Sequence, residues 1–222
     1  MAGTFLKLRS FQTRIYEIVC TPGEGDALRE KNTTALAQTR RRELQQFARL
    51  IGIEKPILLN GCDGFLNPEK NLVEKLVLQL RQIRPQVIIL LSQQDYHHDH
   101  QISFQLGLHA LELAFRNCLT YLGPHLTEGI ILESDGLNLL PQPHLTVNTS
   151  TTHAEKMKAI RQAYQERLGE NLIQFIDALA RLRGRRRGWS AGEAFRLVLP
   201  LWYQLHARNT QILQQFVNLG EN

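Results

Sequence analysis

The chain has 222 residues, of which 43% are hydrophobic and 21% charged, and its formal net charge at pH 7 is +5. This composition indicates one globular domain over residues 1–222 with a full core. No run of about 18 apolar residues exists, which excludes a transmembrane helix, and the N-terminus lacks the apolar core of a signal peptide. Three widely spaced cysteines argue against a disulfide framework and fit a reducing cytoplasm.

Apolar periodicity predicts alternating helices and strands along the first half of the chain. Residues 15–20 are rich in β-branched and apolar side chains, as expected of a strand, and Pro22 then indicates a loop. Leucines recur at helical spacing in residues 72–83, and Pro85 ends that helix before the apolar run 87–91. In order, we expect a helix at 2–12, a strand at 15–20, a helix at 33–50, a strand at 56–59, a helix at 72–83 and a strand at 87–91.

The second half continues the same alternation. We expect a helix at 102–122, strands at 129–133 and 145–148, helices at 153–168 and 170–183, then a short strand from Leu197 to Pro200 and a closing helix to Phe216. Alternating strands and helices predict an α/β fold with a parallel sheet and right-handed crossovers. A doubly wound sheet usually begins on a strand that becomes central, whereas this chain begins on a helix.

The segment Gln94–His100 concentrates three histidines and two aspartates within seven residues, directly after the third predicted strand. Ligands and catalytic groups gather at the carboxyl ends of strands in α/β proteins. His97 and His100 can face one cavity, and Asp95 or Asp99 can fix an imidazole tautomer. A hydrolytic zinc site needs three protein ligands, of which this segment supplies one or two. The alternative is a polar loop in which Asp99 caps the following helix.

Arginines form two clusters, at Arg40–Arg42 and Arg183–Arg187. Such clusters are usually solvated surface. The alternative is an anion site for phosphate, a phospholipid headgroup or nucleic acid. Because no recognised nucleic-acid module accompanies either cluster, no nucleic-acid partner is expected.

Several ordered segments carry a family resemblance. They are Arg40-Arg41-Arg42-Glu43, Leu50-Ile51-Gly52, Asp63-Gly64-Phe65-Leu66, Ile83-Arg84-Pro85-Gln86-Val87, Asp95-Tyr96-His97-His98-Asp99-His100, Lys156–Ile160 and Gly188–Arg196. Together they resemble the LmbE/PIG-L family of zinc-dependent N-acetylglucosaminyl deacetylases, over most of residues 3–198. The resemblance implies a Rossmann-like three-layer sandwich with a mostly parallel sheet, formed by a single domain.

The resemblance also implies roles for individual residues. His100 resembles the third zinc ligand of the family, and His97 the histidine that polarises the acyl oxygen or protonates the leaving amine. Asp99 resembles the partner that orients His97. Arg40 resembles a substrate-contacting arginine, with a surface arginine as the alternative because two more arginines follow it. The loop at 21–24 resembles one that we would place at the rim of the cleft.

One departure from the family is large. The signature Ala-His-Pro-Asp-Asp-Glu, which supplies two zinc ligands and the general base at the end of the first strand, is absent, and Met1–Leu8 resembles the helix that follows it. The first strand is therefore expected to be missing from the sheet. Either the sequence begins late or is a fragment, or it is a non-catalytic relative. The first explanation is favoured, because the free-energy cost of losing a central strand should exceed the roughly 5–15 kcal/mol that keeps a domain folded.

The expected function is zinc-dependent removal of an N-acetyl group from an N-acetylglucosamine-containing conjugate, such as N-acetylglucosaminyl-phosphatidylinositol. Zinc is expected only where the missing ligands are supplied. The expected partner is a small N-acetylated sugar conjugate in the cytoplasm, and homo-oligomerisation is left open. One alternative is a non-catalytic sugar-binding protein on the same fold. Another is a protein that binds anionic membrane surfaces through Arg183–Arg187, whose binding would weaken with added salt.

Overall fold

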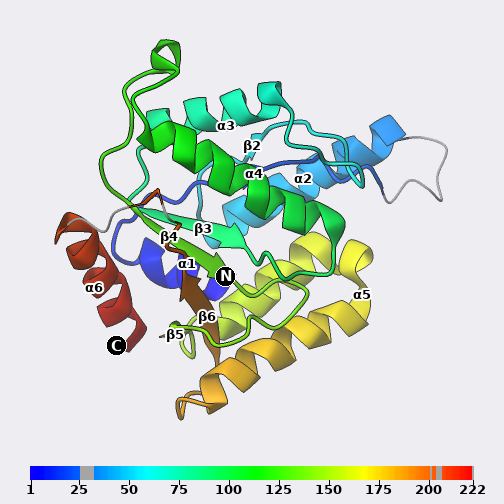
Figure 1. Cartoon of the computed structure of the whole chain (residues 1–222). Coiled ribbons are helices and arrows are strands. Elements are labelled where there is room, and N and C mark those ends of the chain that lie inside the picture. Colours follow the sequence, from blue (N-terminus) through cyan, green and yellow to red (C-terminus); the bar gives the residue numbers. More distant parts are fainter. Residues whose placement is uncertain (26–32, 201, 204–206, 222) are drawn as a thin grey trace. The chain divides into compact units, whose positions relative to one another are not determined.

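The structure is a computed structural model that describes residues 1–25, 33–200, 202–203 and 207–221 (Figure 1). Within those residues the chain forms six α-helices, one short 3-10 helix and six strands. Helices alternate with strands through α4, and two of the strand pairs are parallel. The predicted mixed α/β fold with parallel strands is therefore confirmed. No described helix combines the length and the apolar character needed to cross a bilayer.

The chain divides into two compact units. The first comprises residues 1–63 and 146–194, and the second comprises residues 64–145 and 195–220. The boundary falls inside two strands, β5 (Leu145–Asn148) and β6 (Gly192–Leu197). The single domain expected over residues 1–222 stays a prediction.

The first unit is built mainly from three packed helices and a two-stranded parallel sheet. The helices are α1 (Ala2–Arg9), α2 (Thr33–Ile51) and α5 (His153–Arg185), and the strands are β1 (Ile18–Val19) and β2 (Ile57–Leu58). Apolar side chains from all three helices form one buried cluster, which contains Ala2, Leu6, Ile51 and Ala159. The predicted helix at 2–12 ends earlier, at Arg9, and within the predicted strand at 15–20 only residues 18–19 form the strand β1.

Helix α5 consists of two arms that meet at Gly169, whose φ of 65° and ψ of 167° break the helical path. Only glycine adopts such a conformation readily, and this residue falls in the gap between the two predicted helices. His153 contacts Asp177 across the arms at 2.6 Å, and Arg161 binds Glu170 through two hydrogen bonds. The two arms therefore form a helical hairpin joined by polar contacts.

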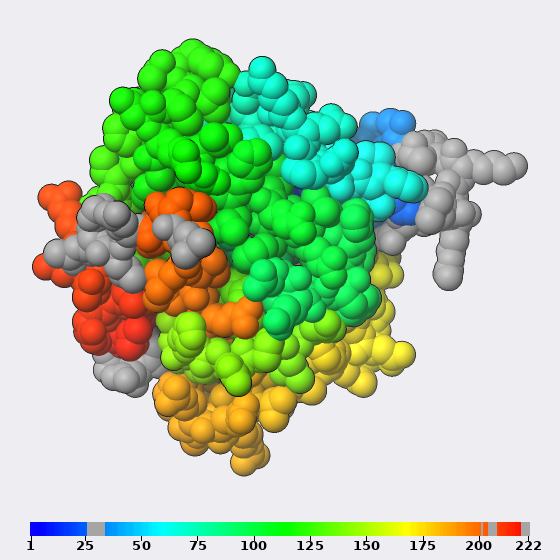
Figure 2. All heavy atoms as spheres, in the orientation of Figure 1, coloured from blue at the N-terminus to red at the C-terminus, as the bar shows by residue number. Residues whose placement is uncertain are grey.

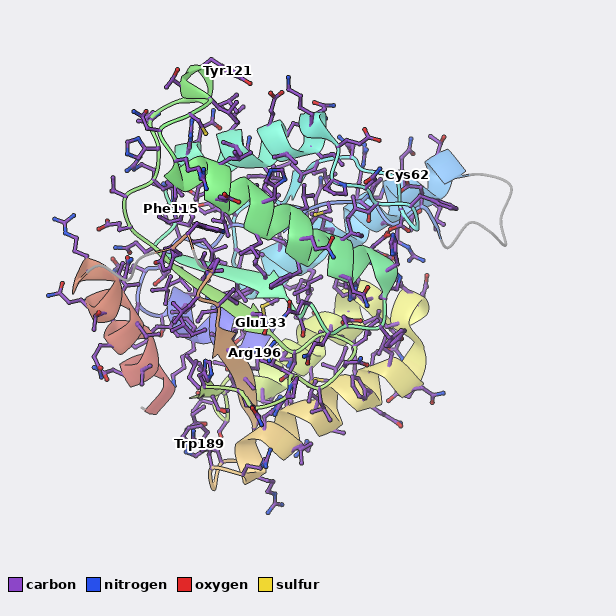
Figure 3. All side chains as sticks on the ribbon, in the orientation of Figure 1. Cys62, Phe115, Tyr121, Glu133, Trp189 and Arg196 are labelled. Carbon is purple, nitrogen blue, oxygen red and sulfur yellow. The ribbon has the colours of Figure 1, made fainter. Side chains whose placement is uncertain are left out.

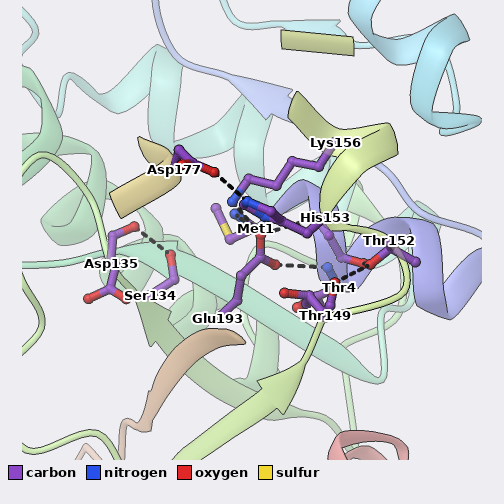
Figure 4. A network of polar contacts seen from close by, with 11 residues as sticks. Met1, Thr4, Ser134, Asp135, Thr149, Thr152, His153, Lys156, Asp177 and Glu193 are labelled. Carbon is purple, nitrogen blue, oxygen red and sulfur yellow. Dashed lines mark hydrogen bonds and ion pairs between the residues drawn. The ribbon is translucent and has the colours of Figure 1, made fainter. Parts of the chain in front are cut away.

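Glu193 is the buried polar centre of the first unit (Figure 4). Its carboxylate accepts hydrogen bonds from the backbone nitrogens of Gly3 and Thr4, at 3.0 and 2.8 Å. The buried Lys156 donates to the same carboxylate at 2.9 Å. Burial alone would raise the pKa of Glu193, but the Lys156 charge and these hydrogen bonds hold it well below the usual range. Glu193 thus joins α1, α5 and β6 in one ionised cluster.

The second unit packs two helices beside a strand pair. Helix α3 (Lys70–Ile83) lies against α4 (His98–Phe115), and α4 covers β3 (Val87–Leu91) (Figure 1). Strand β3 pairs in parallel with β4 (Ile130–Ser134), which pairs antiparallel with β6. The strand order of this sheet is β3-β4-β6-β5. Strand β3 is apolar throughout and runs parallel to β4. The histidine segment, Gln94–His100, follows its carboxyl end and continues into the first turn of α4.

Two predicted boundaries in the second unit are wrong. The helix expected at 102–122 spans 98–115 and is followed by a 3-10 turn, η2 (Thr120–Leu122). The buried Arg81 explains the early end, because its guanidinium donates to five carbonyl oxygens, those of Leu113, Arg116, Cys118, Leu119 and Gly123. The strand expected to start at Leu197 ends there instead. The closing helix is α6 (Ala207–Glu221), and residues 201 and 204–206 of that prediction lie outside the described residues.

Candidate active site

The candidate site lies at the carboxyl end of β3, where residues 92–97 lead into the first turn of α4. Three of the four predicted site residues, His97, Asp99 and His100, are brought together here. His97 is the N-cap residue of α4, and Asp99 and His100 lie in its first turn. The expected position at the end of an apolar parallel strand is thus what the structure has.

Asp95 is the fixed point of this segment. Its side chain is fully buried and accepts hydrogen bonds from the backbone nitrogens of His97 at 3.0 Å and Leu137 at 2.7 Å. Its Oδ2 atom also lies 3.0 Å from Nδ1 of His100. Burial by itself would raise the pKa of Asp95, but the hydrogen bonds from His100, His97 and Leu137 lower it below its ordinary value. Asp95 is therefore an ionised anchor for the start of α4.

Gly136 leaves room for this anchor. A Cβ atom at position 136 would lie 2.1 Å from Oδ2 of Asp95, far inside the contact distance. The carboxylate therefore approaches the backbone at a place where any larger residue would displace it. The sequence signal for this contact was weak, because Asp135-Gly136 reads as an ordinary turn.

The two imidazoles of the site lie side by side. The ring centroids of His97 and His100 are 4.7 Å apart, with an angle of 35° between the ring planes. His97 is exposed, whereas the His100 side chain is 30% exposed and is held through Nδ1 by Asp95. His100 consequently presents its Nε2 atom as the ring nitrogen not engaged by Asp95, and His97 has a solvent-facing ring next to it.

The hydrogen-bond partners of Asp99 differ from those expected of a residue that caps a helix. Its two carboxylate oxygens accept the backbone N–H groups of Gly64 at 2.6 Å and Leu66 at 3.2 Å. The alternative in which Asp99 caps the helix is therefore wrong: His97 occupies the cap position, and Asp99 holds the loop at 64–66 against α4. The residue between the two amides, Phe65, is 74% exposed. An orienting contact from Asp99 to His97 stays a prediction.

A buried ion pair supports the root of the histidine segment. Glu133 of β4 pairs with Arg196 of β6, opposite it in the sheet register (Figure 3). The second carboxylate oxygen of Glu133 accepts the backbone N–H of Gln93 at 3.3 Å. Sequence reasoning missed this pair. The available signal was one acid at the end of the apolar run 129–132, because an acid in a buried strand requires a partner.

Arg40, the fourth predicted site residue, lies in the first unit and is described by its contacts there. Its guanidinium donates to both carboxylate oxygens of Glu43 at 3.0 Å, and its side chain is 12% exposed. The loop at 21–24, expected at a cleft rim, packs Gly23 against the Arg40 side chain. A cavity of about 270 Å³ adjoins this loop and is lined by Pro22, Glu24, Thr34, Ala37, Gln38 and Arg41.

The described residues do not contain a complete metal site. No group of three or more His, Cys, Asp or Glu side chains among them is arranged to hold a metal ion. Within the histidine segment, His100 has the feature common to ligating histidines, a carboxylate that engages its other ring nitrogen. One such histidine falls short of the three protein donors of a hydrolytic zinc site.

Three of the solved structures with a similar fold are the following. N,N'-diacetylchitobiose deacetylase from Pyrococcus horikoshii, complexed with its inhibitor, aligns with a TM-score of 0.80 and 23% identity, covering 93% of this chain and 81% of that chain. The conserved protein TT1542 from Thermus thermophilus aligns with a TM-score of 0.76 and 23% identity, covering 91% of this chain and 90% of that chain. GalB, the 4-carboxy-2-hydroxymuconate hydratase from Pseudomonas putida, aligns with a TM-score of 0.77 and 19% identity, covering 93% of each chain.

These likenesses show the fold, and because a deacetylase and a hydratase share it, the fold does not fix the reaction. No curated protein sequence matches the chain. The sequence of residues 1–111, half of the chain, matches the PIG-L family, described as GlcNAc-PI de-N-acetylase. That segment includes the whole of the histidine segment and the first three turns of α4. The chain therefore belongs to the PIG-L family of de-N-acetylases.

Proposed function

We propose that this chain is a hydrolase that removes an acetyl group from an N-acetylglucosamine-containing conjugate, such as N-acetylglucosaminyl-phosphatidylinositol. Membership of a de-N-acetylase family supports the reaction type. The observation that carries the proposal is the pair of imidazoles at the start of α4, one fixed by a buried carboxylate and the other exposed. Such a pair assigns different tasks to two neighbouring histidines.

The reaction breaks the amide C–N bond. Water adds its oxygen to the carbonyl carbon, a proton passes to the amine nitrogen, and the products are acetate and the free amino sugar. His97 is suited to donate a hydrogen bond to the carbonyl oxygen as negative charge develops, or a proton to the leaving amine. Its position as the N-cap of α4 adds the positive end of the helix dipole, which favours that charge.

His100 is suited to hold one position of a metal ion through Nε2, because Asp95 engages Nδ1 and fixes the orientation of the ring. Zinc in such family sites would supply an activated water molecule. The described residues provide only this one donor, so the zinc dependence belongs to the proposal as a property to be tested by metal analysis. The geometry supports one contribution by this chain, which is a fixed orientation of the His100 ring.

The sugar ring has two exposed aromatic neighbours to contact. Tyr96, 68% exposed, directly precedes His97, and Phe65, 74% exposed, lies on the loop that Asp99 holds. A pyranose has an apolar face of C–H groups that packs on aromatic rings. We assign Phe65 and Tyr96 to that contact and Asp99 to positioning Phe65. Arg40, in the first unit, keeps the role of a substrate-contacting arginine that the family resemblance implies.

The test is release of acetate from N-acetylglucosaminyl-phosphatidylinositol, measured with and without added zinc, together with metal analysis of the purified protein. His97→Ala should lower the rate about 10²–10⁴-fold, the range of a general acid. His98→Ala is the matched control, because His98 is exposed in the same segment and has no assigned role. Equal rates for both variants would overturn the role of His97, and no acetate release at any zinc concentration would overturn the hydrolase.

A second candidate function is a non-catalytic glycoconjugate-binding protein. The absence of a three-donor group among the described residues favours it. This candidate predicts that the conjugate binds without turnover and that a metal chelator leaves the dissociation constant unchanged. Calorimetric titration of the intact conjugate, with and without chelator, separates the two candidates.

A further inference from the structure

The second arm of α5 and the turn after it hold much of the positive charge of the chain. Residues 170–189 contain five arginines against one glutamate and one aspartate, a net charge of +3 in a chain whose total is +5. We call these residues the α5 tip. Figure 2 shows the arm, in gold to orange, at the lower edge of the view, and Figure 3 shows Trp189 at the turn.

The two acids of the α5 tip are engaged by other groups. Asp177 contacts Arg181 at 2.8 Å and His153 at 2.6 Å, and Glu170 binds Arg161 of the first arm. Neither carboxylate therefore offsets the charge at the end of the helix. These pairs leave the arginines of the turn as the cationic surface of the arm.

Three of the four arginines in the cluster at Arg183–Arg187 are exposed to solvent. Arg183 is only 5% exposed, and Gly184 lies so close to the backbone of Ala191 that a Cβ atom there would approach within 2.6 Å. Arg185, Arg186 and Arg187 are all exposed. The packed pair at 183–184 thus fixes the base of the turn, and the next three side chains extend into solvent.

Apolar side chains are exposed on the same arm. Phe175 is 37% exposed and Leu182 is 48% exposed. Residues seven positions apart lie on one helix face two turns from each other, and Arg186, four positions after Leu182, continues that face. The α5 tip therefore presents an apolar stripe that ends in consecutive arginines, with Trp189 beside them.

We propose that the α5 tip docks this protein onto an anionic lipid bilayer. A bilayer offers anionic headgroups above hydrocarbon, and it complements a helix that carries both exposed arginines and exposed apolar side chains. A nucleic acid would complement the arginines but not Leu182 and Phe175. A second copy of this chain would bring the same net charge of +3 against the first. The proposal stands independently of the proposed hydrolase activity.

The experiment is co-sedimentation of the full chain with phosphatidylcholine vesicles that contain about one third phosphatidylserine. Replacing Arg185, Arg186 and Arg187 by Gln should weaken binding at least about tenfold, because each arginine near the surface contributes. The matched control replaces Arg42, Arg49 and Lys55 by Gln, which removes the same charge from exposed positions in or just after α2. The control should bind within about twofold of the unmodified chain.

Two further arms separate the apolar and electrostatic parts. Leu182→Gln should weaken vesicle binding several-fold without changing its salt dependence, since it removes apolar contact only. Raising the salt from about 50 to 300 mM should weaken binding of the unmodified chain and leave the triple arginine variant nearly unaffected. Far-ultraviolet circular dichroism of each variant confirms that the helices are intact.

Three outcomes would overturn the proposal. Equal binding to pure phosphatidylcholine vesicles would remove the need for anionic lipid. Tighter binding to a short DNA duplex, lost with the arginines but not with Leu182, would identify nucleic acid as the partner. Concentration-dependent self-association that the same substitutions abolish would identify a second copy. Failure of the deacetylase assay changes none of these readings.

Discussion

Two buried carboxylates, one in each unit, show how similar chemistry can serve different ends. Glu193 and Asp95 are both ionised, both accept two backbone N–H groups, and both contact a cationic or titratable side chain. The difference lies in that third partner. Lys156 is 5% exposed and closes the Glu193 cluster, whereas the His100 side chain is 30% exposed and extends the Asp95 cluster toward solvent.

The comparison separates a buried carboxylate that stabilises the fold from one that orients a side chain for function. A carboxylate paired with a buried ammonium stabilises the fold, because neither charge has solvent to compensate for the other. A carboxylate that fixes a partly exposed imidazole orients a group able to meet a substrate. Substitutions at the two sites should therefore differ in kind, with stability affected most at Glu193 and activity most at Asp95.

Glu193→Gln should produce the largest loss of stability. The amide removes the charge that faces Lys156 and leaves that ammonium buried without compensation, which costs about 3–5 kcal/mol of unfolding free energy. Urea denaturation measures the effect. The double variant Glu193→Gln with Lys156→Met, which keeps an acceptor oxygen for the amides of α1, should recover most of the loss, and a double variant as unstable as the single one would contradict the ion-pair explanation.

Acid should destabilise the protein through the same carboxylate. The pKa of Glu193 is lowered in the folded state, so its contribution is fully present above the unfolded value of about 4.3 and is lost as pH falls toward the folded value. Unfolding free energy should therefore decline below about pH 4.5. The Glu193→Gln/Lys156→Met variant should show a shallower decline, and an unchanged slope would assign the acid sensitivity elsewhere.

Asp95→Asn should cost less stability and more activity. The side-chain nitrogen of Asn cannot accept a hydrogen bond, so one of the three groups that contact Asp95, in His97, Leu137 and His100, loses its acceptor. This loss costs about 1–3 kcal/mol of unfolding free energy. Misorientation of His100 should lower acetate release about 10–100-fold. Gln94→Ala, at an exposed neighbouring position, is the control in both the denaturation and the activity measurements. A stability loss with full activity would place Asp95 in the same class as Glu193.

Gly136→Ala tests the Asp95 site without removing a charge. The added Cβ atom would lie 2.1 Å from Oδ2 of Asp95, so the carboxylate must shift. We expect a stability cost of about 1–3 kcal/mol, typical of overpacking, with reduced acetate release. Gly188→Ala is the comparison, because it lies in the first unit and its Cβ atom meets nothing within 4 Å, although its φ of 78° is strained. Equal activity in both variants would show that the contact at position 136 is not specific.

Phe65→Ala should have the smallest effect on stability, within about 0.5 kcal/mol, because the ring is 74% exposed. If the ring contacts the sugar, the KM for the conjugate should rise several-fold while kcat changes little. Phe11→Ala, also an exposed phenylalanine, is the matched control. Identical KM values for the two variants would remove Phe65 from the substrate contact.

Most of the fold followed from local pattern. Apolar periodicity placed α2, α3 and β3 within a few residues, and Gly169 falls in the gap predicted between the two α5 helices. Strand β6 was not predicted as such, because its residues include Glu193 and Arg196, whose charges are neutralised by partners distant in the sequence. Charged residues argue against a buried strand until those tertiary partners are known.

The position of the candidate site could be predicted from the sequence, but the hydrogen-bond partners of its residues could not. The clustering of histidines after an apolar strand identified the segment, and His97, Asp99 and His100 do lie together. The early start of α4 at His98 was not foreseen, because the group that satisfies the His97 amide is the upstream Asp95 side chain. The partners of Asp99, on a loop about 35 residues earlier, depend on tertiary structure that no local pattern encodes.

The bond between Gly3 and Glu193 joins residues 190 positions apart, which has a consequence for synthesis on the ribosome. At roughly 5–20 residues per second, α1 would emerge about 10–40 s before the carboxylate that satisfies its first amides. The contiguous part of the second unit, residues 64–145, can meanwhile form its parallel strand pair and the helices beside it. Helix α1 thus leaves the ribosome well before the carboxylate that secures its first two amides has been made.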